Sequence, residues 1–284
     1  MDMGVESDYD PAVDAVLRIS KSSFMTYCMC PRQYWWRYIG LRDVRLPKTP
    51  QMIRGTHVHD ALEKMYEGMD GETEAVDLRK LMPQDSDDEA LDILADLQAQ
   101  IIEKMGDDAT PAAFEERLEI FDEQNEVLLV GIPDAVLTTG NNIIIVELKT
   151  GQQSSSKITR VRRELCFYRY IFELMGHEYD NTYFMYIAPD CENFNVVEEF
   201  QKKKNGDAVY GLIKGWAAIE KMNMRSYNSF RKKYSEVVEG MKTLNWDINW
   251  NDYFCPQWCD FHLSCEGEIM GYAESPIPGV EKNE

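Results

Sequence analysis

The chain has 284 residues, 44% of them hydrophobic and 11% aromatic, which is enough for one large folded domain or a domain with an appendage. Its net charge of −20 at face value argues against a nucleic-acid partner, although the distribution of charge along the chain qualifies this. The acidic start and the lack of an apolar run of roughly 20 residues argue against a secretory signal and a membrane span. We therefore expect a cytoplasmic protein in which residues 1–19 form a flexible acidic leader.

The predicted elements change character along the chain. In order, the patterns predict helices at 22–38 (interrupted by Pro31), 55–68 and 85–105, strands at 114–121, 126–137 and 142–149, a helix at 158–175, strands at 182–187 and 195–200, and mostly helix over 208–241. Residues 242–284 are expected to be a Trp- and Cys-rich loop with a polar tail. The sum is a mixed α/β fold with a central mixed sheet flanked by helices.

Charge is distributed unevenly along the chain. Residues 85–126 hold fifteen acidic residues against two basic ones, whereas residues 20–60 hold seven Lys or Arg against two Asp. Residues 157–169 hold five basic residues against one Glu. The two basic stretches are compatible with a local phosphate-binding track, and a solvated surface is the alternative for each.

The stretch "GIPDAVLTTGNNIIIVELKTG" at 131–151 combines an apolar run with charged residues. Glu147 and Lys149 lie on one face of their strand, and a neighbouring strand that carries Asp134 would bring a second carboxylate beside them. Two carboxylates suit Mg²⁺ or Mn²⁺, and Lys149 would orient a metal-bound water or stabilise developing charge. An ordinary ion pair at a strand end is the alternative.

Four stretches, which follow one another along the chain in the family's order, resemble the PD-(D/E)xK nucleases, specifically the RecB-like branch. They are "GIPDAV…VELKTG", "RGTHVHDALE", which is similar to a helical G-T-x-x-H-x-x-L-E motif, "ELCFYRY", which is similar to Q-L-x-x-Y, and "FMTYCMCPRQYWWRYIG". The last resembles the C-P-R stretch of the iron–sulfur members, among them CRISPR-associated and phage RecB-type exonucleases. The resemblance covers roughly residues 20–265.

The resemblance implies a metal-dependent DNA nuclease with a restriction-endonuclease-like core. His59, Asp134 and Glu147 would hold one or two Mg²⁺ or Mn²⁺ ions, Lys149 would assist the attacking water, and Tyr168 would contact the DNA backbone or brace the site. His57 competes with His59, but residues two apart do not share a helical face, and the spacing from Gly55 favours His59.

Glu164 departs from the family pattern, which has glutamine at this position. Glutamine donates and accepts hydrogen bonds, whereas ionised glutamate only accepts. Glu164 would therefore add negative charge near phosphate, act as an extra metal ligand, or have a raised pKa.

The cysteines suggest a second metal centre. Cys255, Cys259 and Cys265 follow a C-x3-C-x5-C spacing, and Cys30 in the C-P-R stretch supplies a fourth thiol. Four thiolates hold either Zn²⁺ or an iron–sulfur cluster, and the resemblance favours [4Fe–4S]. Cys28 is the alternative fourth ligand, and His262 is an alternative ligand for zinc. The remaining cysteines, Cys166 and Cys191, are most simply small buried hydrophobes.

The resulting prediction is a RecB-like nuclease domain over residues 20–265, with a helical insertion at about 70–110 and an iron–sulfur clasp that joins Cys30 to residues 255–265. Residues 266–284 form the polar tail. The expected function is exonuclease action on single-stranded DNA or DNA ends. The alternatives are a DNA-end-binding accessory subunit of a CRISPR-adaptation or recombination complex and a zinc-stabilised DNA-binding module. The candidate DNA-binding residues are Arg32, Arg37, Arg54 and Arg162.

Overall fold

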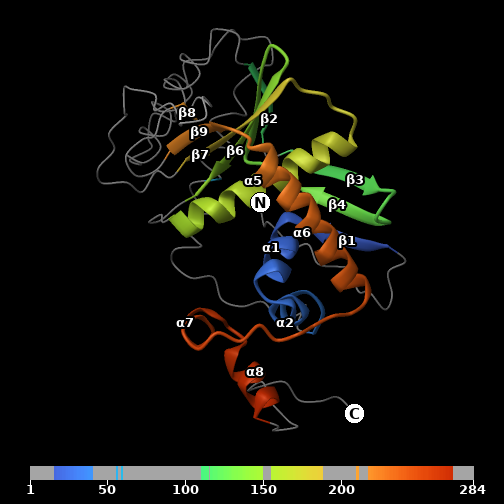
Figure 1. Cartoon of the computed structure of the whole chain (residues 1–284), viewed down its shortest axis with the longest axis vertical. Coiled ribbons are helices and arrows are strands. Elements are labelled where there is room, and N and C mark those ends of the chain that lie inside the picture. Colours follow the sequence, from blue (N-terminus) through green and yellow to red (C-terminus); the bar gives the residue numbers. More distant parts are fainter. Residues whose placement is uncertain are drawn as a thin grey trace. The chain divides into compact units, whose positions relative to one another are not determined.

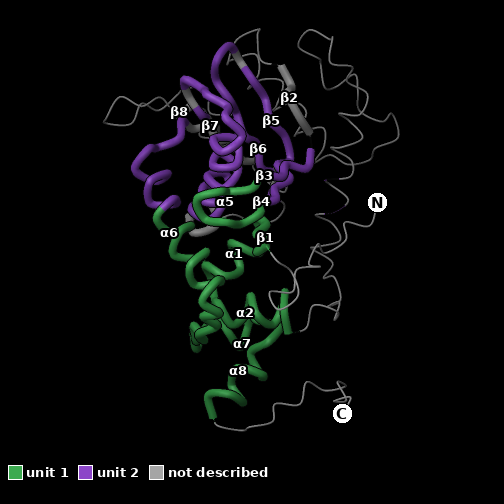
Figure 2. Tube along the Cα trace, turned by 90° about the vertical axis from the view of Figure 1, so that its right-hand side faces the viewer, with its two compact units in different colours: residues 1–46, 121–128, 232–284 green, residues 47–120, 129–231 purple. Residues whose placement is uncertain are grey.

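A computed structural model describes residues 16–40, 56, 59, 110–114, 116–149, 155–187, 209–210 and 217–270. The chain divides into two compact units, coloured separately in Figure 2. Unit 1 comprises residues 1–46, 121–128 and 232–284, and unit 2 comprises residues 47–120 and 129–231.

The elements begin with β1 (Leu17–Ser20), which includes the end of the segment predicted as the acidic leader, and continue as a mixture of helices and strands (Figure 1). The others, in chain order, are α1 (Lys21–Met29), α2 (Pro31–Trp35), η1 (Trp36–Gly40), β2 (Thr110–Phe114), β3 (Leu118–Asp122), β4 (Val127–Gly131), β5 (Ala135–Thr139), β6 (Asn142–Leu148), α5 (Ser155–Leu174), β7 (Asn181–Ile187), β8 (Val209–Tyr210), β9 (Ala217–Lys221), α6 (Met224–Lys242), α7 (Phe254–Trp258) and α8 (His262–Ile269). No helix among the described residues is long and apolar enough to cross a membrane.

The six-stranded sheet has the strand order β2-β5-β6-β7-β9-β8. The β6–β7 pair is parallel and the other pairs are antiparallel, so the predicted mixed sheet is confirmed. Between β6 and β7 the chain forms α5, which packs against both strands, as a parallel pair with a helical crossover requires (Figure 1). A three-stranded sheet has the order β1-β4-β3.

The apolar run of β6 is the centre of the six-stranded sheet. Four consecutive side chains, Ile143–Val146, are at most 2% exposed. Because successive side chains point to opposite faces of a strand, both faces of β6 are covered. The buried α5 side chains Leu165 and Ile171 belong to the same apolar core. Burial of each such side chain contributes about 1.5–3 kcal/mol to stability.

The single strand predicted at 126–137 is wrong, because β4 and β5 are separate strands that belong to different sheets. The break falls at residues 132–134, where Pro133 has no backbone N–H to donate to a ladder. The predicted strand at 114–121 is likewise divided, between the end of β2 and β3.

The prediction of mostly helix over 208–241 is wrong for its first part. The described residues there form β8 and β9, and only the segment from Met224 onward is helical. Antiparallel pairing of β9 with β7, with Ile219 opposite Met185, outweighs the helical periodicity. The loop predicted after residue 242 contains the short helices α7 and α8.

Several predicted features lie outside the described residues. They are the helix at 85–105, most of the helix at 55–68, most of the insertion at 70–110, the strand at 195–200, and the residues His57, Arg54 and Cys191.

In unit 1 the N-terminal helices contact the segment that follows α6. Tyr27 donates a hydrogen bond to the Asn245 carbonyl at 2.8 Å, and Asn249 Nδ2 donates one to the Met29 carbonyl at 2.9 Å. The ring of Tyr34 stacks on Trp246, with 5.6 Å between centroids. Protein contacts therefore join the two ends of the described chain.

A close approach at Gly131 generates a prediction for unit 2. A Cβ atom at this position would lie 2.9 Å from Ile171 Cδ1 and 3.0 Å from Tyr168 Cε1. We expect Gly131→Ala to lower the free energy of unfolding by about 1–3 kcal/mol, because the buried neighbours must shift. Urea unfolding followed by circular dichroism measures the change.

The matched control is Arg163→Ala, at an exposed position of α5 in the same unit, where alanine suits the helix. A destabilisation of the control as large as that of Gly131→Ala would contradict the packing explanation.

Candidate functional site

The β5–β6 hairpin brings two carboxylates to the same edge of the sheet. Its register pairs Ala135, the first residue of β5, with Val146, so Asp134 just before β5 and Glu147 just after Val146 lie at the same end of the hairpin. Gly140 is the first residue of the two-residue turn, the position at which type II′ hairpins favour glycine. Asp134 is 6% exposed and Glu147 is 1% exposed. Buried carboxylates such as these need compensating groups.

Lys149 lies between two buried glutamates. Its Nζ is 2.5 Å from Glu147 Oε1 and 2.8 Å from Glu164 Oε2. Glu164, on α5, is 4% exposed, and its Oε1 also accepts a hydrogen bond from Arg160 Nε at 3.1 Å. The helix thus supplies a second carboxylate to Lys149, and Arg160 adds a second cation to Glu164.

His59 extends the group on the side of Asp134. The His59 Nδ1 atom is 3.5 Å from Asp134 Oδ1, and the backbone at His59 is helical. These contacts within unit 2 therefore form two groups: His59 with Asp134, and Lys149 with Glu147 and Glu164.

Tyr168 is fully buried one helical turn after Glu164. Its hydroxyl donates a 2.6 Å hydrogen bond to the Ile132 carbonyl, in the break between β4 and β5. Burial, followed by the negative charges of Glu147 and Asp134, raises the pKa of Tyr168 well above its usual value. Tyr168 therefore stays protonated and braces the backbone next to Asp134.

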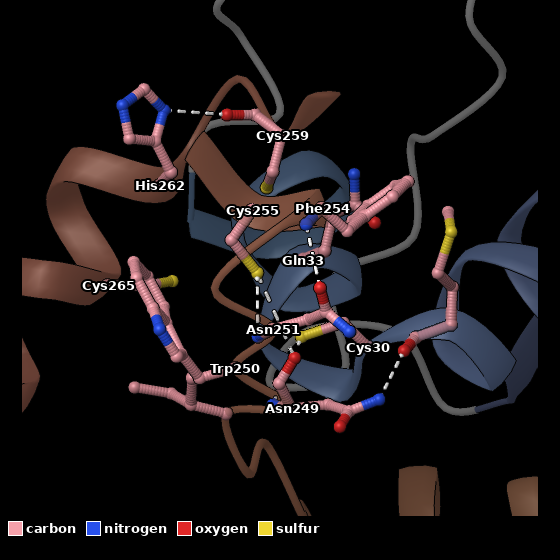
Figure 3. A pocket seen from close by; sticks show the side chains of 12 residues that line it. Cys30, Gln33, Asn249, Trp250, Asn251, Phe254, Cys255, Cys259, His262 and Cys265 are labelled. Atoms are coloured by element: carbon pink, nitrogen blue, oxygen red, sulfur yellow. Dashed lines mark hydrogen bonds between the residues drawn. The ribbon is translucent and has the colours of Figure 1, made fainter. Parts of the chain in front are cut away.

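Four cysteines line one cavity of about 230 Å³ in unit 1: Cys30, Cys255, Cys259 and Cys265 (Figure 3). Cys30 reaches it because it has an extended backbone between α1 and α2, where Pro31 starts the second helix. The other three come from α7, the residue after it, and α8. Cys28 is not among the lining residues, which favours Cys30 as the fourth thiol.

Backbone N–H groups point at two of these sulfurs. Asn249 N donates to Cys30 Sγ at 3.5 Å, and Asn251 N donates to Cys255 Sγ at 3.3 Å (Figure 3). Burial raises the pKa of Cys265 to about 11 and also raises that of Cys259, with the neighbouring thiols adding to both shifts. A metal would reverse this preference, because a coordinating thiol is deprotonated.

The predicted arginines occupy different surroundings. Arg32 forms an ion pair with Glu268 at 3.1 Å, and Arg37 forms one with Asp260 at 3.4 Å. These pairs join α2 and η1 to the C-terminal segment of unit 1 and neutralise part of the predicted basic track. Arg162 is half-buried on α5.

Comparison with protein families identifies the chain. The family model described as the PD-(D/E)XK nuclease superfamily matches residues 18–266. The chain belongs to this superfamily. Comparison with curated proteins gave no match. The crystal structure of SSO0001 is similar to this PD-(D/E)XK protein, with 16% identity, a TM-score of 0.44, and coverage of 88% of this chain and 85% of that chain.

Membership of the PD-(D/E)XK superfamily supports a metal-dependent nuclease that acts on DNA, and the mixed sheet agrees with the superfamily fold. In the described part of the protein, no group of three or more His, Cys, Asp or Glu side chains is already arranged to hold a metal ion. The donor types nevertheless fit. Carboxylates and an imidazole suit Mg²⁺ or Mn²⁺, and four thiols around one cavity suit zinc or an iron–sulfur cluster.

Two charged groups of the nuclease were missed from the sequence. Arg160 is a partner of Glu164, and its i,i+4 spacing on a helix is a signal that the sequence contains. Asp122 is fully buried in unit 1 and accepts hydrogen bonds from Tyr234 Oη at 2.8 Å and Asn125 Nδ2 at 2.7 Å. No local pattern indicates the contact between Asp122 and Tyr234.

The double pairing of Glu164 generates a stability prediction for the nuclease. We expect Glu164→Ala to lower the free energy of unfolding by about 1–3 kcal/mol, because Lys149 and Arg160 each lose a carboxylate. Glu164→Gln keeps an acceptor oxygen and should cost about half as much. Urea unfolding in the presence of a chelator measures both variants, and equal values for the two would contradict a role for the acceptor.

Proposed function

We propose that the protein is a Mg²⁺- or Mn²⁺-dependent DNA exonuclease of the RecB-like branch, acting on single strands or on DNA ends. The observation that carries the proposal is the convergence of Asp134, Glu147 and Lys149 at the edge of the sheet, with His59 beside Asp134. The proposal is supported by the chain's membership of the PD-(D/E)XK nuclease superfamily and by the resemblance of these residues to its motif. Phosphodiester hydrolysis by an activated water is the reaction it fits.

In this proposal His59, Asp134 and Glu147 hold the metal. A divalent ion bound by them would supply a water of lowered pKa and would neutralise charge on the phosphate. Asp134 and Glu147 supply oxygen ligands at the same end of one hairpin, and the contact between His59 and Asp134 sets the imidazole at the same edge. Backbone pairing therefore holds two of the three groups at one end of the hairpin.

Lys149 acts as a positioned cation for the attacking water or the developing phosphate charge. Two carboxylates, those of Glu147 and Glu164, hold its ammonium group. The ammonium contacts a carboxylate oxygen of Glu147 and one of Glu164, and these two contacts fix its position beside the proposed metal ligands. In this proposal Glu164 positions Lys149, and this role accounts for a glutamate at the place where the family has glutamine.

The four cavity thiols, Cys30, Cys255, Cys259 and Cys265, are the proposed ligands of a [4Fe–4S] cluster. Such a cluster would supply a covalent link between the N-terminal helices and the C-terminal segment. The N–H groups of Asn249 and Asn251 support this choice, because hydrogen bonds to sulfur stabilise cluster thiolates. The six described cysteines form no disulfide with one another.

The resemblance to CRISPR-associated and phage RecB-type exonucleases carries an alternative. In that alternative the protein binds DNA ends within an adaptation or recombination complex and contributes little cleavage of its own. Arg32, Arg37, Arg54 and Arg162 are the proposed DNA contacts in both cases. Cleavage by the purified protein separates the two functions.

The catalytic assignment predicts loss of cleavage in Glu147→Ala and in Lys149→Ala. We expect each variant to lose about 100-fold or more of the rate on single-stranded DNA with Mn²⁺, because one removes a metal ligand and the other a charge stabiliser. Strands labelled at either end report both the rate and the direction of digestion.

The matched control for cleavage is Lys221→Ala, which removes an exposed lysine at the end of β9. It should cleave as the wild type does. Wild-type cleavage rates in both Glu147→Ala and Lys149→Ala would contradict the catalytic assignment. A wild-type protein that binds DNA ends but does not cleave them would favour the accessory role.

The cluster assignment predicts iron in the wild-type protein and its loss in Cys30→Ala. Protein purified without oxygen should be brown, because an iron–sulfur cluster absorbs broadly in the visible range. Cys28→Ala is the matched control and should retain iron, since Cys28 does not line the cavity. Elemental analysis measures iron and zinc in all three proteins.

Stoichiometric zinc without iron in the wild type would refute the iron–sulfur assignment and favour a zinc site. In that case His262 becomes a further candidate ligand, because it lines the same cavity. If iron were retained in Cys30→Ala and lost in Cys28→Ala, the cluster assignment would stand, but Cys28 would replace Cys30 as the fourth ligand.

A further inference from the structure

A second cavity, of about 460 Å³, lies in unit 2 at the other end of β6 from the candidate active site. It is lined by the β5–β6 turn, the last turns of α5 and the loop that leads into β7. The parallel register pairs Asn142 with Asn181 at this end and Glu147 with Tyr186 at the other. Five residues of strand separate the two ends, which corresponds to about 16 Å. The cavity is therefore separate from the carboxylate group.

Arg169 lines this cavity, and its side chain has hydrogen-bond donors without an acceptor among the described residues. Its Nε and Nη1 atoms are buried, and neither has a hydrogen-bond partner among the described residues. Its guanidinium lies over the ring of Tyr227, 6.0 Å from the centroid, which orients the group. Buried donors without acceptors are unfavourable, so a ligand that offers acceptors to this guanidinium would be stabilised.

The carboxylate of α5 that lines the cavity is engaged with other partners. Glu173 also lines the cavity, but its Oε2 accepts a 2.8 Å hydrogen bond from the Tyr227 hydroxyl. Its Oε1 lies 3.6 Å from Arg231 Nη1. Glu173 is therefore engaged with Tyr227 and Arg231.

The loop before β7 adds rings and carboxylates to the same cavity. The rings of His177 and Tyr179 stack at 6.0 Å with an interplanar angle of 19°, and His177 is exposed. Glu178 and Asp180 are also lining residues and are exposed. Their charges would repel a phosphate, so the ligand must offer acceptors to Arg169 and donors to a carboxylate without being an anion at that edge.

We propose that this cavity binds an unpaired guanine base. The O6 and N7 atoms of guanine accept from the fork of an arginine, and its N1–H and N2 amino groups donate to a carboxylate such as Glu178 or Asp180. The purine ring stacks on the aromatic surface of His177 and Tyr179. Adenine has an amino group, which is a hydrogen-bond donor, in place of O6. It would therefore oppose the Arg169 guanidinium with another donor, and the two could not form a hydrogen bond there.

The proposal is tested by titration calorimetry on the full chain, with a chelator present so that cleavage does not interfere. The probes are guanosine and adenosine monophosphates, and oligothymidylates that contain one central guanine or one central adenine. We expect each guanine probe that binds to do so about tenfold more tightly than its adenine counterpart. If only the oligonucleotides bind, the cavity takes a base that belongs to a DNA strand. If the monophosphates bind as well, the cavity also takes free nucleotides.

Arg169→Lys keeps the charge and the alkyl stem but removes the planar fork, so it should abolish the guanine preference. Arg163→Lys, on the exposed face of the same helix, is the matched control and should keep it. Circular dichroism checks that both variants fold, and Asp180→Asn and Glu178→Gln test the acceptor side without altering Arg169. Equal binding of guanine and adenine probes, no binding of any probe, or an unchanged preference in Arg169→Lys would overturn the proposal. Because binding is measured without cleavage, these results leave the nuclease assignment untouched.

Discussion

The need to compensate buried carboxylates governs the structure of unit 2 around the candidate site. Asp134, Glu147 and Glu164 are each at most 6% exposed, and a buried charge without a partner would destabilise the fold severely. Lys149 lies between two of them and His59 beside the third. Arg160 is the further cation on Glu164. The three acids and their partners therefore have to be assembled together, by one hairpin and one helix.

This constraint explains why the surrounding sheet is so apolar. A hairpin can hold Asp134 and Glu147 at one end only if its register is unique, and a one-residue slip would reverse every side chain of the strand. The four buried side chains of Ile143–Val146 make such a slip costly. Tyr168 strengthens the arrangement from α5, since its hydroxyl satisfies the Ile132 carbonyl where the ladder is broken. The apolar packing of β6 and the hydrogen bond to the Ile132 carbonyl thus favour the same register of the β5–β6 hairpin.

Unit 1 is stabilised differently. Its N-terminal helices and C-terminal segment are joined by aromatic stacking, by hydrogen bonds to loop carbonyls and by the ion pairs of Arg32 and Arg37. The extended backbone of Cys30 places its thiol within this contact region. The proposed cluster would add a metal link to a junction that the protein already forms, which explains how four thiols from distant segments come to line one cavity.

Local patterns were sufficient for the parts of the structure that depend on neighbouring residues. Alternation set Glu147 and Lys149 on one strand face, and helical spacing predicted α5 nearly to its ends. The predictions from local patterns were wrong where strands pair with segments that are distant in the sequence. One example is β9, which pairs with β7, and another is the pair β4 and β5, which belong to different sheets on either side of Pro133.

By itself the sequence determined the residue types of the candidate site and the strand that carries two of them, because period-two geometry is a property of the backbone. Only the tertiary structure decided that Glu164 meets Lys149, since this contact requires α5 to pack on β6. The same holds for Cys30, whose sulfur accepts from Asn249, 219 residues away. Such contacts depend on how the elements pack against one another, and no local pattern encodes that packing.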